Sequence, residues 1–195
     1  MKRIFDFTCS FVGLFFLSPL ILLLSTILIK STSKGPVFFI QERVGKDGKI
    51  FKMIKFRSMF VTQEPSSTIS IKGDIRVTKI GVFLRRYKLD ELPELINVLL
   101  GHMSLVGPRP DVPGYSDKLV GEDRNILELR PGITGPASLK YSNEEEILGK
   151  QKNPKAYNDE VIYPDKIRIN LEYYNNQSIW LDIKIIFATI FRTSY

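Results

Sequence analysis

The feature that most constrains this chain is an uncharged, strongly apolar run near its amino terminus. Residues 7–29 hold no charged side chain. Basic residues lie on both sides of the run, Lys2 and Arg3 before it and Lys30 after it. As one helix these 23 residues would measure about 35 Å, which exceeds the roughly 30 Å of a bilayer's hydrocarbon core. The run therefore predicts a membrane segment.

A serine–proline pair interrupts the middle of this run. Pro19 removes a backbone N–H, its ring clashes with the carbonyl of Phe15, and it biases Ser18 away from helical geometry. The two arms are then about 18 Å and 15 Å long, each roughly half a bilayer. Ser18 and Pro19 therefore predict a break in the membrane helix.

Three topologies are compatible with this broken run. A re-entrant hairpin keeps both basic ends on the cytoplasmic side, as the positive-inside tendency favours when no second span follows. An ordinary span tolerates the proline if a serine hydroxyl satisfies the carbonyl that proline leaves free. A cleaved signal peptide is disfavoured because the run is too long and no Ala-x-Ala site follows it. The residues alone do not separate the hairpin from the span.

The rest of the chain has the size and composition of one globular domain. With 195 residues, 44% of them hydrophobic, the sequence predicts an anchor at residues 1–34 and a single domain at 35–195. The formal charge of +7 suits phosphate, nucleic acid or anionic lipid as a partner. One cysteine, Cys9, and one histidine, His102, exclude a disulfide framework and a Cys/His zinc site. Any metal must therefore be held by oxygen.

Local patterns predict the first elements of this domain. Alternating side chains on both sides of a glycine-rich turn at 45–48 predict a β-hairpin with strands at 37–43 and 49–59. Apolar residues at helical spacing in 80–87, and again in 92–99, predict two amphipathic helices.

The following segments have weaker patterns. Two proline-stiffened loops, at 107–110 and 130–136, should be rigid and extended. Residues 143–150 should be helical and 151–164 irregular. The serine- and threonine-rich stretch 62–73 should be a mobile loop.

The last element, at residues 179–191, is apolar but too short to span a membrane. It is either a buried helix or an interfacial one with Trp180 at the boundary, and the pattern slightly favours the interfacial helix. The predicted fold class is therefore α+β and helix-rich. A re-entrant membrane helix hairpin precedes a compact cytoplasmic domain that contains a small β-hairpin and interfacial amphipathic helices.

An acidic pair at the expected start of the second amphipathic helix is the strongest candidate for chemistry. Asp90 and Glu91 follow Arg85 closely, and a helix N-terminus favours a bound anion. A carboxylate can hold Mg²⁺ or attack phosphorus as a nucleophile. Further cations that could grip phosphate lie on one face of the second strand and in the two stiff loops: Lys55, Arg57, Arg109 beside Pro108, and Arg130.

A purely structural interpretation also fits this spacing. Asp90 can be an ordinary N-cap, Glu91 a favourable first-turn charge, and the arginines a solvated surface. From the spacing alone this interpretation is the more economical one.

Longer motifs point to a known family. They include TKIGVFLRR at 78–86, LDELPELINVL at 89–99, MSLVGPRP at 103–110 and RPGITG at 130–135. Shorter ones are KRIFD at 2–6, the pair Ser18 and Pro19, KFRSM at 55–59 and LDIK at 181–184. Over nearly its whole length the chain resembles the bacterial sugar transferases called monotopic phosphoglycosyl transferases. Its length resembles that of the minimal members, without extra amino-terminal spans.

The resemblance implies a function and roles for particular residues. The family moves a sugar phosphate from a UDP-sugar to a polyprenol phosphate, here expected to be undecaprenyl phosphate, and uses Mg²⁺. By resemblance Asp90 is the nucleophile and a metal ligand, Glu91 is its catalytic partner, and the Ser18 and Pro19 break belongs to a re-entrant membrane helix. The implied substrate-binding residues are Lys55, Arg57, Arg85, Pro108, Arg109 and Arg130.

The same resemblance implies the protein's surroundings. The expected location is the cytoplasmic face of the bacterial inner membrane, with membrane lipid and downstream glycosyltransferases as partners. One departure from the family matters, because the residues after RPGITG, from Pro136 to about residue 164, are unfamiliar. The resemblance therefore does not imply which sugar is transferred.

Two other function classes have distinct signatures. A nucleic-acid-binding protein should show clustered basic residues with base-stacking aromatics in a recognisable module, so nucleic acid is not expected as a partner. A non-catalytic, basic membrane scaffold would keep the anchor and tolerate the loss of Asp90.

Overall fold

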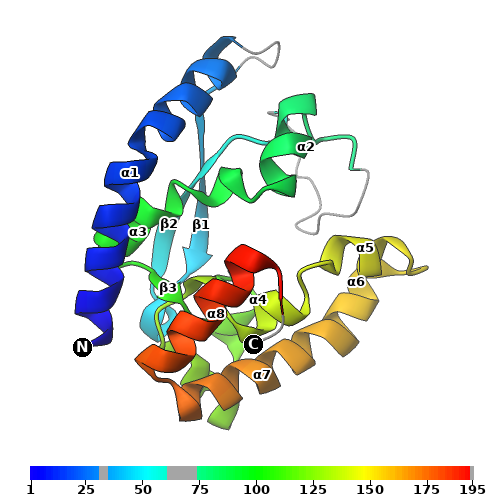
Figure 1. Cartoon of the computed structure of the whole chain (residues 1–195). Coiled ribbons are helices and arrows are strands. Elements are labelled where there is room, and N and C mark those ends of the chain that lie inside the picture. Colours follow the sequence, from blue (N-terminus) through cyan, green and yellow to red (C-terminus); the bar gives the residue numbers. More distant parts are fainter. Residues whose placement is uncertain (31–34, 61–73, 194–195) are drawn as a thin grey trace.

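The computed structural model describes residues 1–30, 35–60 and 74–193, and the predicted loop at 62–73 lies outside them. Its helices are α1 (Lys2–Lys30), α2 (Lys79–Arg86), α3 (Glu94–Leu99), α4 (Pro136–Lys140), α5 (Glu144–Gly149), α6 (Pro154–Tyr157), α7 (Tyr163–Asn176) and α8 (Ile179–Phe191). Its strands are β1 (Phe38–Val44), β2 (Ile50–Phe56), β3 (Ser104–Val106) and β4 (Gly132–Thr134). The fold is α+β and helix-rich, as the sequence predicts (Figure 1).

Strands β1 and β2 form the predicted β-hairpin. They pair antiparallel in continuous register, with Gln41 opposite Met53. The turn Lys46–Gly48 joins them, and Asp47 there has a left-handed φ of 57°, which a short side chain that bonds to its own backbone tolerates. Met53 is buried in a cluster with Val98 of α3. The hairpin is thereby fixed against the helix that follows the acidic pair.

Helices α2 and α3 confirm the two predicted amphipathic helices. Thr78 begins α2, where its hydroxyl accepts a hydrogen bond of 2.8 Å from the backbone N–H of Gly81. Leu84 of α2 and Val98 of α3 have no measurable exposure. Each helix therefore buries its apolar side, as the spacing predicts.

The expectation that Asp90 caps the second of these helices is wrong. Helix α3 begins at Glu94, and Asp90 lies before it in a tight 3-10 turn, Leu89–Glu91. A cap at Asp90 would accept from the backbone N–H two or three residues further on, but the N–H of Leu92 donates to the Leu89 carbonyl and Pro93 has no N–H. The carboxylates of this turn are therefore not used as caps.

The segment just before the first proline-stiffened loop pairs with the second such loop as a short parallel sheet, which local patterns did not predict. Strands β3 and β4 pair with Val106 opposite Thr134. Three glycines allow this contact: a Cβ at Gly107, Gly132 or Gly135 would lie 2.1–2.3 Å from backbone atoms of the neighbouring segment. The close approach fixes the start of the loop that carries Arg109.

The carboxyl-terminal third is more helical than the sequence suggests. The expectation of an irregular segment at 151–164 is wrong, because Asn153 caps α6 and a π-helical turn, Asn158–Ile162, continues into α7. This part of the chain has many charged residues, but it also contains a short apolar stripe that includes the buried Ile162 and Ile167. The predicted helices at 143–150 and 179–191 are confirmed as α5 and α8.

Helix α1 runs continuously through Pro19. The Ser18 hydroxyl donates a 2.8 Å hydrogen bond to the Phe15 carbonyl, the group that proline leaves without its usual partner. A serine hydroxyl that bonds to this carbonyl is the arrangement expected where a membrane helix tolerates a proline. Figure 1 shows one helix and not two arms folded back on each other, so the re-entrant hairpin stays a prediction.

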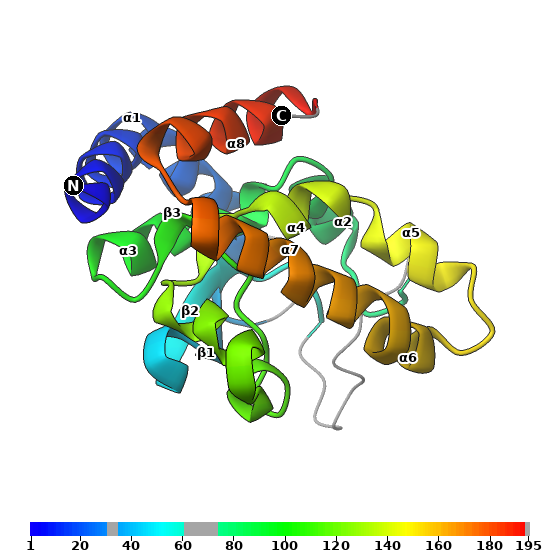
Figure 2. The same cartoon turned by 90° about the horizontal axis from the view of Figure 1, so that it is seen from below.

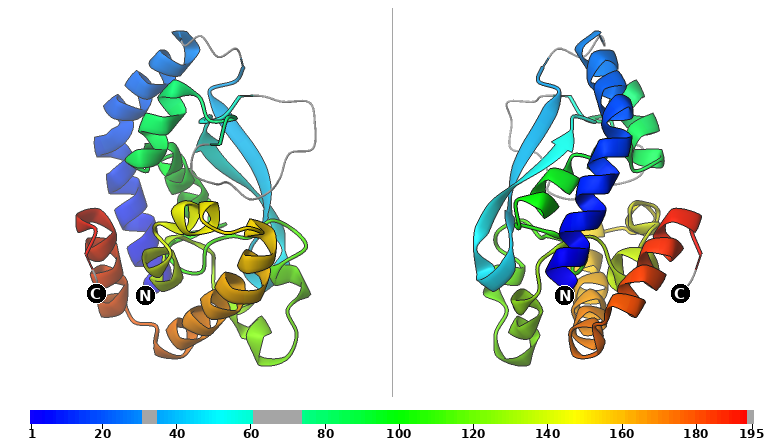
Figure 3. Two further views of the ribbon diagram at one scale, coloured as in Figure 1. Left: turned by 90° about the vertical axis from the view of Figure 1, so that its right-hand side faces the viewer. Right: turned by 60° about the vertical axis from the view of Figure 1, so that its left-hand side comes forward.

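Both halves of α1 contact the folded domain. Near its start, Arg3 donates to the carbonyls of Val98 and Leu99 at the end of α3, at 2.5 and 2.8 Å. Its second half buries Leu24 and Leu28 in a cluster with residues of β2 and α2. Figure 3 shows α1 lying along the domain for its whole length.

Two polar anchors hold the first turns of α1. The Asp6 carboxylate accepts hydrogen bonds from the Ser104 hydroxyl and the Leu105 backbone N–H, at 2.8 and 3.2 Å. Lys2 forms an ion pair of 2.5 Å with Asp182 of α8. Helices α1 and α8 therefore start beside each other, on one side of the molecule (Figure 2).

The outer surfaces of α1 and α8 are strongly apolar. Among the described residues, Lys2–Leu28 is the one helical segment long and apolar enough to cross a bilayer. Phe16 on α1 is 74% exposed and Trp180 on α8 is 76% exposed. Exposed apolar surface on this scale indicates a membrane or protein contact.

Candidate active site

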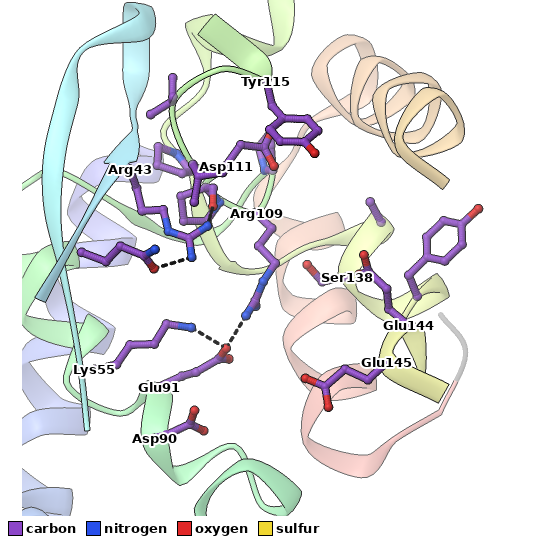
Figure 4. A pocket seen from close by; sticks show the side chains of 18 of the residues that line it. Arg43, Lys55, Asp90, Glu91, Arg109, Asp111, Tyr115, Ser138, Glu144 and Glu145 are labelled. Atoms are coloured by element: carbon purple, nitrogen blue, oxygen red, sulfur yellow. Dashed lines mark hydrogen bonds and ion pairs between the residues drawn. The ribbon is translucent and has the colours of Figure 1, made fainter. Parts of the chain in front are cut away.

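Seven of the eight site residues predicted in the domain line one pocket of about 1240 Å³. These residues are Lys55, Arg57, Arg85, Asp90, Glu91, Pro108 and Arg109. Figure 4 shows Asp90, Glu91 and Lys55 at one end of the pocket and Arg109 near its middle. On the described surface, the pocket brings together segments from the hairpin, the 3-10 turn and the loop after β3.

The Glu91 carboxylate is the centre of the charged network. Its Oε1 atom lies 2.9 Å from Nζ of Lys55 and 2.6 Å from a terminal nitrogen of Arg109. Lys55 also lies 3.1 Å from the carboxylate of Glu94 on α3. Glu91 and Glu94 are buried, so their charges depend on these cations for compensation.

The adjacent carboxylates of the dyad have opposite pKa shifts. Burial, followed by the charge of Glu91, raises the pKa of Asp90. Burial alone would also raise the pKa of Glu91, but the charges of Arg109, Lys55 and Lys88 hold it well below its usual range. Such divergence between neighbouring groups is typical of residues with different chemical roles.

Asp90 has the environment of a nucleophile. Its side chain is almost fully buried, yet it forms no hydrogen bond to any described residue. It lies at the edge of the pocket (Figure 4). A poorly solvated carboxylate with no hydrogen bond to weaken it is free to attack an electrophile.

The other predicted residues have different surroundings. Arg85 forms an ion pair with Glu145 of α5, which joins the two sides of the pocket. Arg57 is buried, with 3% of its surface exposed. Arg130 does not line the pocket, and its Nε donates to the Gly101 carbonyl at 2.9 Å. The structure therefore does not bring Arg130 to the other site residues.

Several polar residues of the pocket were missed by the sequence analysis. They come from β1, the segment after β3, and helices α4, α5 and α7: Arg43, Asp111, Tyr115, Ser138, Tyr141, Glu144, Lys166 and Asn170. Burial, followed by the charge of Arg109, lowers the pKa of Arg43 to about 10. Burial raises the pKa of Asp111 to about 6. The signal that could have found part of this set is the helical spacing of Tyr163, Lys166 and Asn170.

The oxygen donors suit a metal ion that is held jointly with a substrate. Among the described residues, no group of three or more His, Cys, Asp or Glu side chains could hold a metal by itself. Mg²⁺ commonly uses one or two carboxylates together with substrate phosphates and water. The Asp90 carboxylate has no hydrogen-bond partner among the described residues, so it could supply one such ligand.

Comparison with known proteins places the chain in a family. A sequence model described as "Bacterial sugar transferase" matches residues 1–194. The chain belongs to the bacterial sugar transferase family. The resemblance seen in the motifs is thereby confirmed.

Curated members of this family are similar to the chain along most of its length. It is 41% identical, over 98% of its own length, to a UDP-glucose:undecaprenyl-phosphate glucose-1-phosphate transferase from Klebsiella pneumoniae. It is 39% identical, over 97% of its length, to the exopolysaccharide production protein PSS of Rhizobium leguminosarum bv. phaseoli, and covers 93% of that protein.

A third relative is named for a different sugar. The chain is 46% identical, over 74% of its length, to a putative undecaprenyl-phosphate N-acetylgalactosaminyl 1-phosphate transferase of Bacillus subtilis (strain 168), and covers 79% of it. The chain covers a smaller share of the larger family members. The chain spans 39% of the Klebsiella pneumoniae relative and 40% of an Escherichia coli (strain K12) relative with the same name.

We expect Lys55→Met to destabilise the fold by about 3–5 kcal/mol, because it leaves the buried Glu94 carboxylate without a cation and removes one of the two cations that contact Glu91. Thermal or denaturant unfolding in detergent measures the effect. The matched control is Lys52→Met on the exposed face of the same strand, which should change stability by less than about 1 kcal/mol. Adding Glu94→Gln to Lys55→Met should recover part of the loss. Equal stability of the Lys55 and Lys52 variants would contradict the account.

Proposed function

We propose that this chain transfers a sugar 1-phosphate from a UDP-sugar to undecaprenyl phosphate, in the assembly of a bacterial polysaccharide or glycan. The names of the relatives supply the substrate classes. The observation that carries the proposal is the Asp90 and Glu91 dyad, whose pKa values are shifted in opposite directions at one end of a pocket with several cations.

Asp90 is the nucleophile of the first half-reaction. One oxygen of its carboxylate attacks the β-phosphorus of the UDP-sugar, the phosphorus that carries the sugar. The bond from this phosphorus to the bridging oxygen breaks, and UMP leaves with the bonding electron pair. The sugar phosphate remains on Asp90 as an acyl phosphate. The burial of Asp90 and the absence of a described hydrogen bond to it support this role.

The second half-reaction returns Asp90 to its starting state. An oxygen of undecaprenyl phosphate attacks the same phosphorus, and the bond to the Asp90 carboxylate breaks. The product is an undecaprenyl diphosphate that carries the sugar. Because both displacements occur at phosphorus, the anomeric bond of the sugar is retained. UMP leaves before the lipid attacks, so the kinetics are ping-pong.

Glu91 and the cations form a fixed electrostatic frame for this chemistry. The low pKa of Glu91 keeps it anionic, so it holds Lys55 and Arg109 beside Asp90 through contacts of 2.9 and 2.6 Å. Cations fixed in this way neutralise charge on transferring and departing phosphates. Asp90 would also hold Mg²⁺ together with the diphosphate, and the bound ion supplies further neutralising charge.

The membrane arrangement follows from the substrates. A polyprenol phosphate stays in the bilayer and a UDP-sugar stays in water, so the site must lie at their boundary, on the cytoplasmic face of the membrane. The exposed apolar surfaces of α1 and α8 support this placement. A 29-residue helix is about 43 Å long, and both of its halves contact the domain. We therefore propose that α1 enters and leaves the membrane on one face.

The expected activity is UMP release from a UDP-sugar in detergent with undecaprenyl phosphate and Mg²⁺, measured across UDP-glucose, UDP-galactose and their N-acetylamino forms. Asp90→Asn should lower turnover by at least about a thousandfold, as loss of a nucleophile does. Asp123→Asn, on the exposed surface away from the pocket, is the matched control and should keep normal turnover. Undiminished turnover of Asp90→Asn would reject this mechanism, because the protein would then act without Asp90 as its nucleophile.

The topology can be tested with single cysteines in a Cys9→Ser background. One cysteine is inserted after Met1 and the other is Pro36→Cys, beyond the end of α1. In intact cells both should resist an impermeant thiol reagent until the membrane is permeabilised. Labelling at the amino terminus alone in intact cells would establish a true span. Ser18→Ala with Pro19→Ala should favour that outcome, because residue 19 regains its backbone hydrogen bond and the stiffer helix is long enough to cross.

A further inference from the structure

The pocket extends well beyond the dyad and Arg109. At the end opposite Asp90 in Figure 4 lie Arg43, Asp111 and Tyr115. Helix α7 adds Tyr163 and Asn170 to the lining. We call these five residues the distal end of the pocket.

Some buried side-chain nitrogen and oxygen atoms at the distal end have no hydrogen-bond partner among the described residues. Of the buried side-chain atoms that have no hydrogen bond within the described chain, three belong to the distal end: Nε of Arg43, the hydroxyl of Tyr163 and Oδ1 of Asn170. Asn170 is only 7% exposed. Buried polar atoms in native proteins are nearly always hydrogen-bonded, and here three unpaired ones line a single pocket. Their common location points to a ligand that supplies the missing bonds.

The local backbone is built to present these groups. The π-helical turn Asn158–Ile162 leads directly into α7 at Tyr163. Such turns are rare in proteins overall, but where they occur they often lie at functional sites. Tyr163 and Asn170 are seven residues apart, which places them on the same face of α7. The ring of Tyr115 lies 5.3 Å from that of Tyr163, edge to face. The distal end therefore combines unpaired polar atoms with aromatic surface.

We propose that the distal end binds the nucleoside of the donor, with Arg43, Tyr163 and Asn170 as its recognition residues. This inference rests on the proposed function, in which the donor is a UDP-sugar. In a displacement at phosphorus the attacking and leaving oxygens lie on opposite sides of the phosphorus. With Asp90 attacking from one end and Arg109 beside the phosphates, the departing UMP points towards the distal end.

The unpaired atoms match the edge of uracil. That edge has one N–H donor between two carbonyl acceptors. Oδ1 of Asn170 can accept from the N–H, while Nε of Arg43 and the hydroxyl of Tyr163 can donate to oxygens of the base or ribose. The distal end can therefore provide hydrogen-bond partners for a uracil nucleotide.

Calorimetric titration of the full chain in detergent with UDP tests this assignment. Tyr163→Phe and Asn170→Ala should each weaken UDP binding by roughly tenfold, the loss expected for one or two hydrogen bonds. The matched controls are Tyr174→Phe and Asn176→Ala, polar residues of the same helix outside the pocket, and these should bind UDP normally.

Thermal unfolding of the free protein separates binding from folding. The Tyr163 hydroxyl has no hydrogen-bond partner among the described residues, so Tyr163→Phe should unfold at the same or a higher temperature while it binds UDP more weakly. If Tyr163 had no role in binding, Tyr163→Phe would leave both the unfolding temperature and the UDP affinity unchanged. This variant therefore keeps the test valid even if Asn170→Ala folds poorly.

The outcomes also separate this inference from the proposed reaction. Unchanged UDP affinity in both variants, with normal UMP release by the wild-type chain, would overturn the nucleoside assignment alone. Unchanged UDP affinity with altered choice among UDP-sugars would assign the distal end to the sugar and also overturn it. Weakened UDP binding in a chain that releases no UMP would support the assignment and reject the proposed transfer.

Discussion

One buried carboxylate, that of Glu91, holds the site together. It contacts Lys55 from the hairpin and Arg109 from the loop after β3, and Lys55 extends the network to Glu94 on α3. Segments that are far apart in the sequence are thereby fixed around a single negative charge. Because an unpaired charge in this position would be costly, the same contacts that stabilise the fold also set the charges around Asp90.

The elements that the sequence predicted are those with a strong local signal. The β1–β2 hairpin, α2, α3, α5 and α8 follow from turn residues and from apolar spacing. The parallel pairing of β3 with β4 depends on close contacts between distant glycines, which no local pattern contains. The segment 151–164 has few apolar residues, so its helices depend on packing against the domain more than on its own periodicity.

The candidate site was predictable at the dyad and less so away from it. Asp90, Glu91, Lys55 and Arg109 could be named from motifs, although the N-cap argument for Asp90 was wrong because α3 begins only at Glu94. The distal residues of the pocket could not be named, because they lie in helices that the sequence analysis missed or beside motifs with no evident chemistry. Sequence patterns therefore indicate the candidate reacting groups more readily than the residues that line the rest of the pocket.

The account depends most on the covalent step at Asp90, and the mass of the intact protein measures it directly. The wild-type chain is incubated with a UDP-sugar and Mg²⁺ in the absence of undecaprenyl phosphate, so that the second half-reaction cannot proceed. The account predicts a gain in mass equal to one sugar phosphate, which disappears on addition of the lipid phosphate and is absent from Asp90→Asn. An active preparation that never gains this mass, together with an Asp90→Asn variant that still turns over, would contradict it.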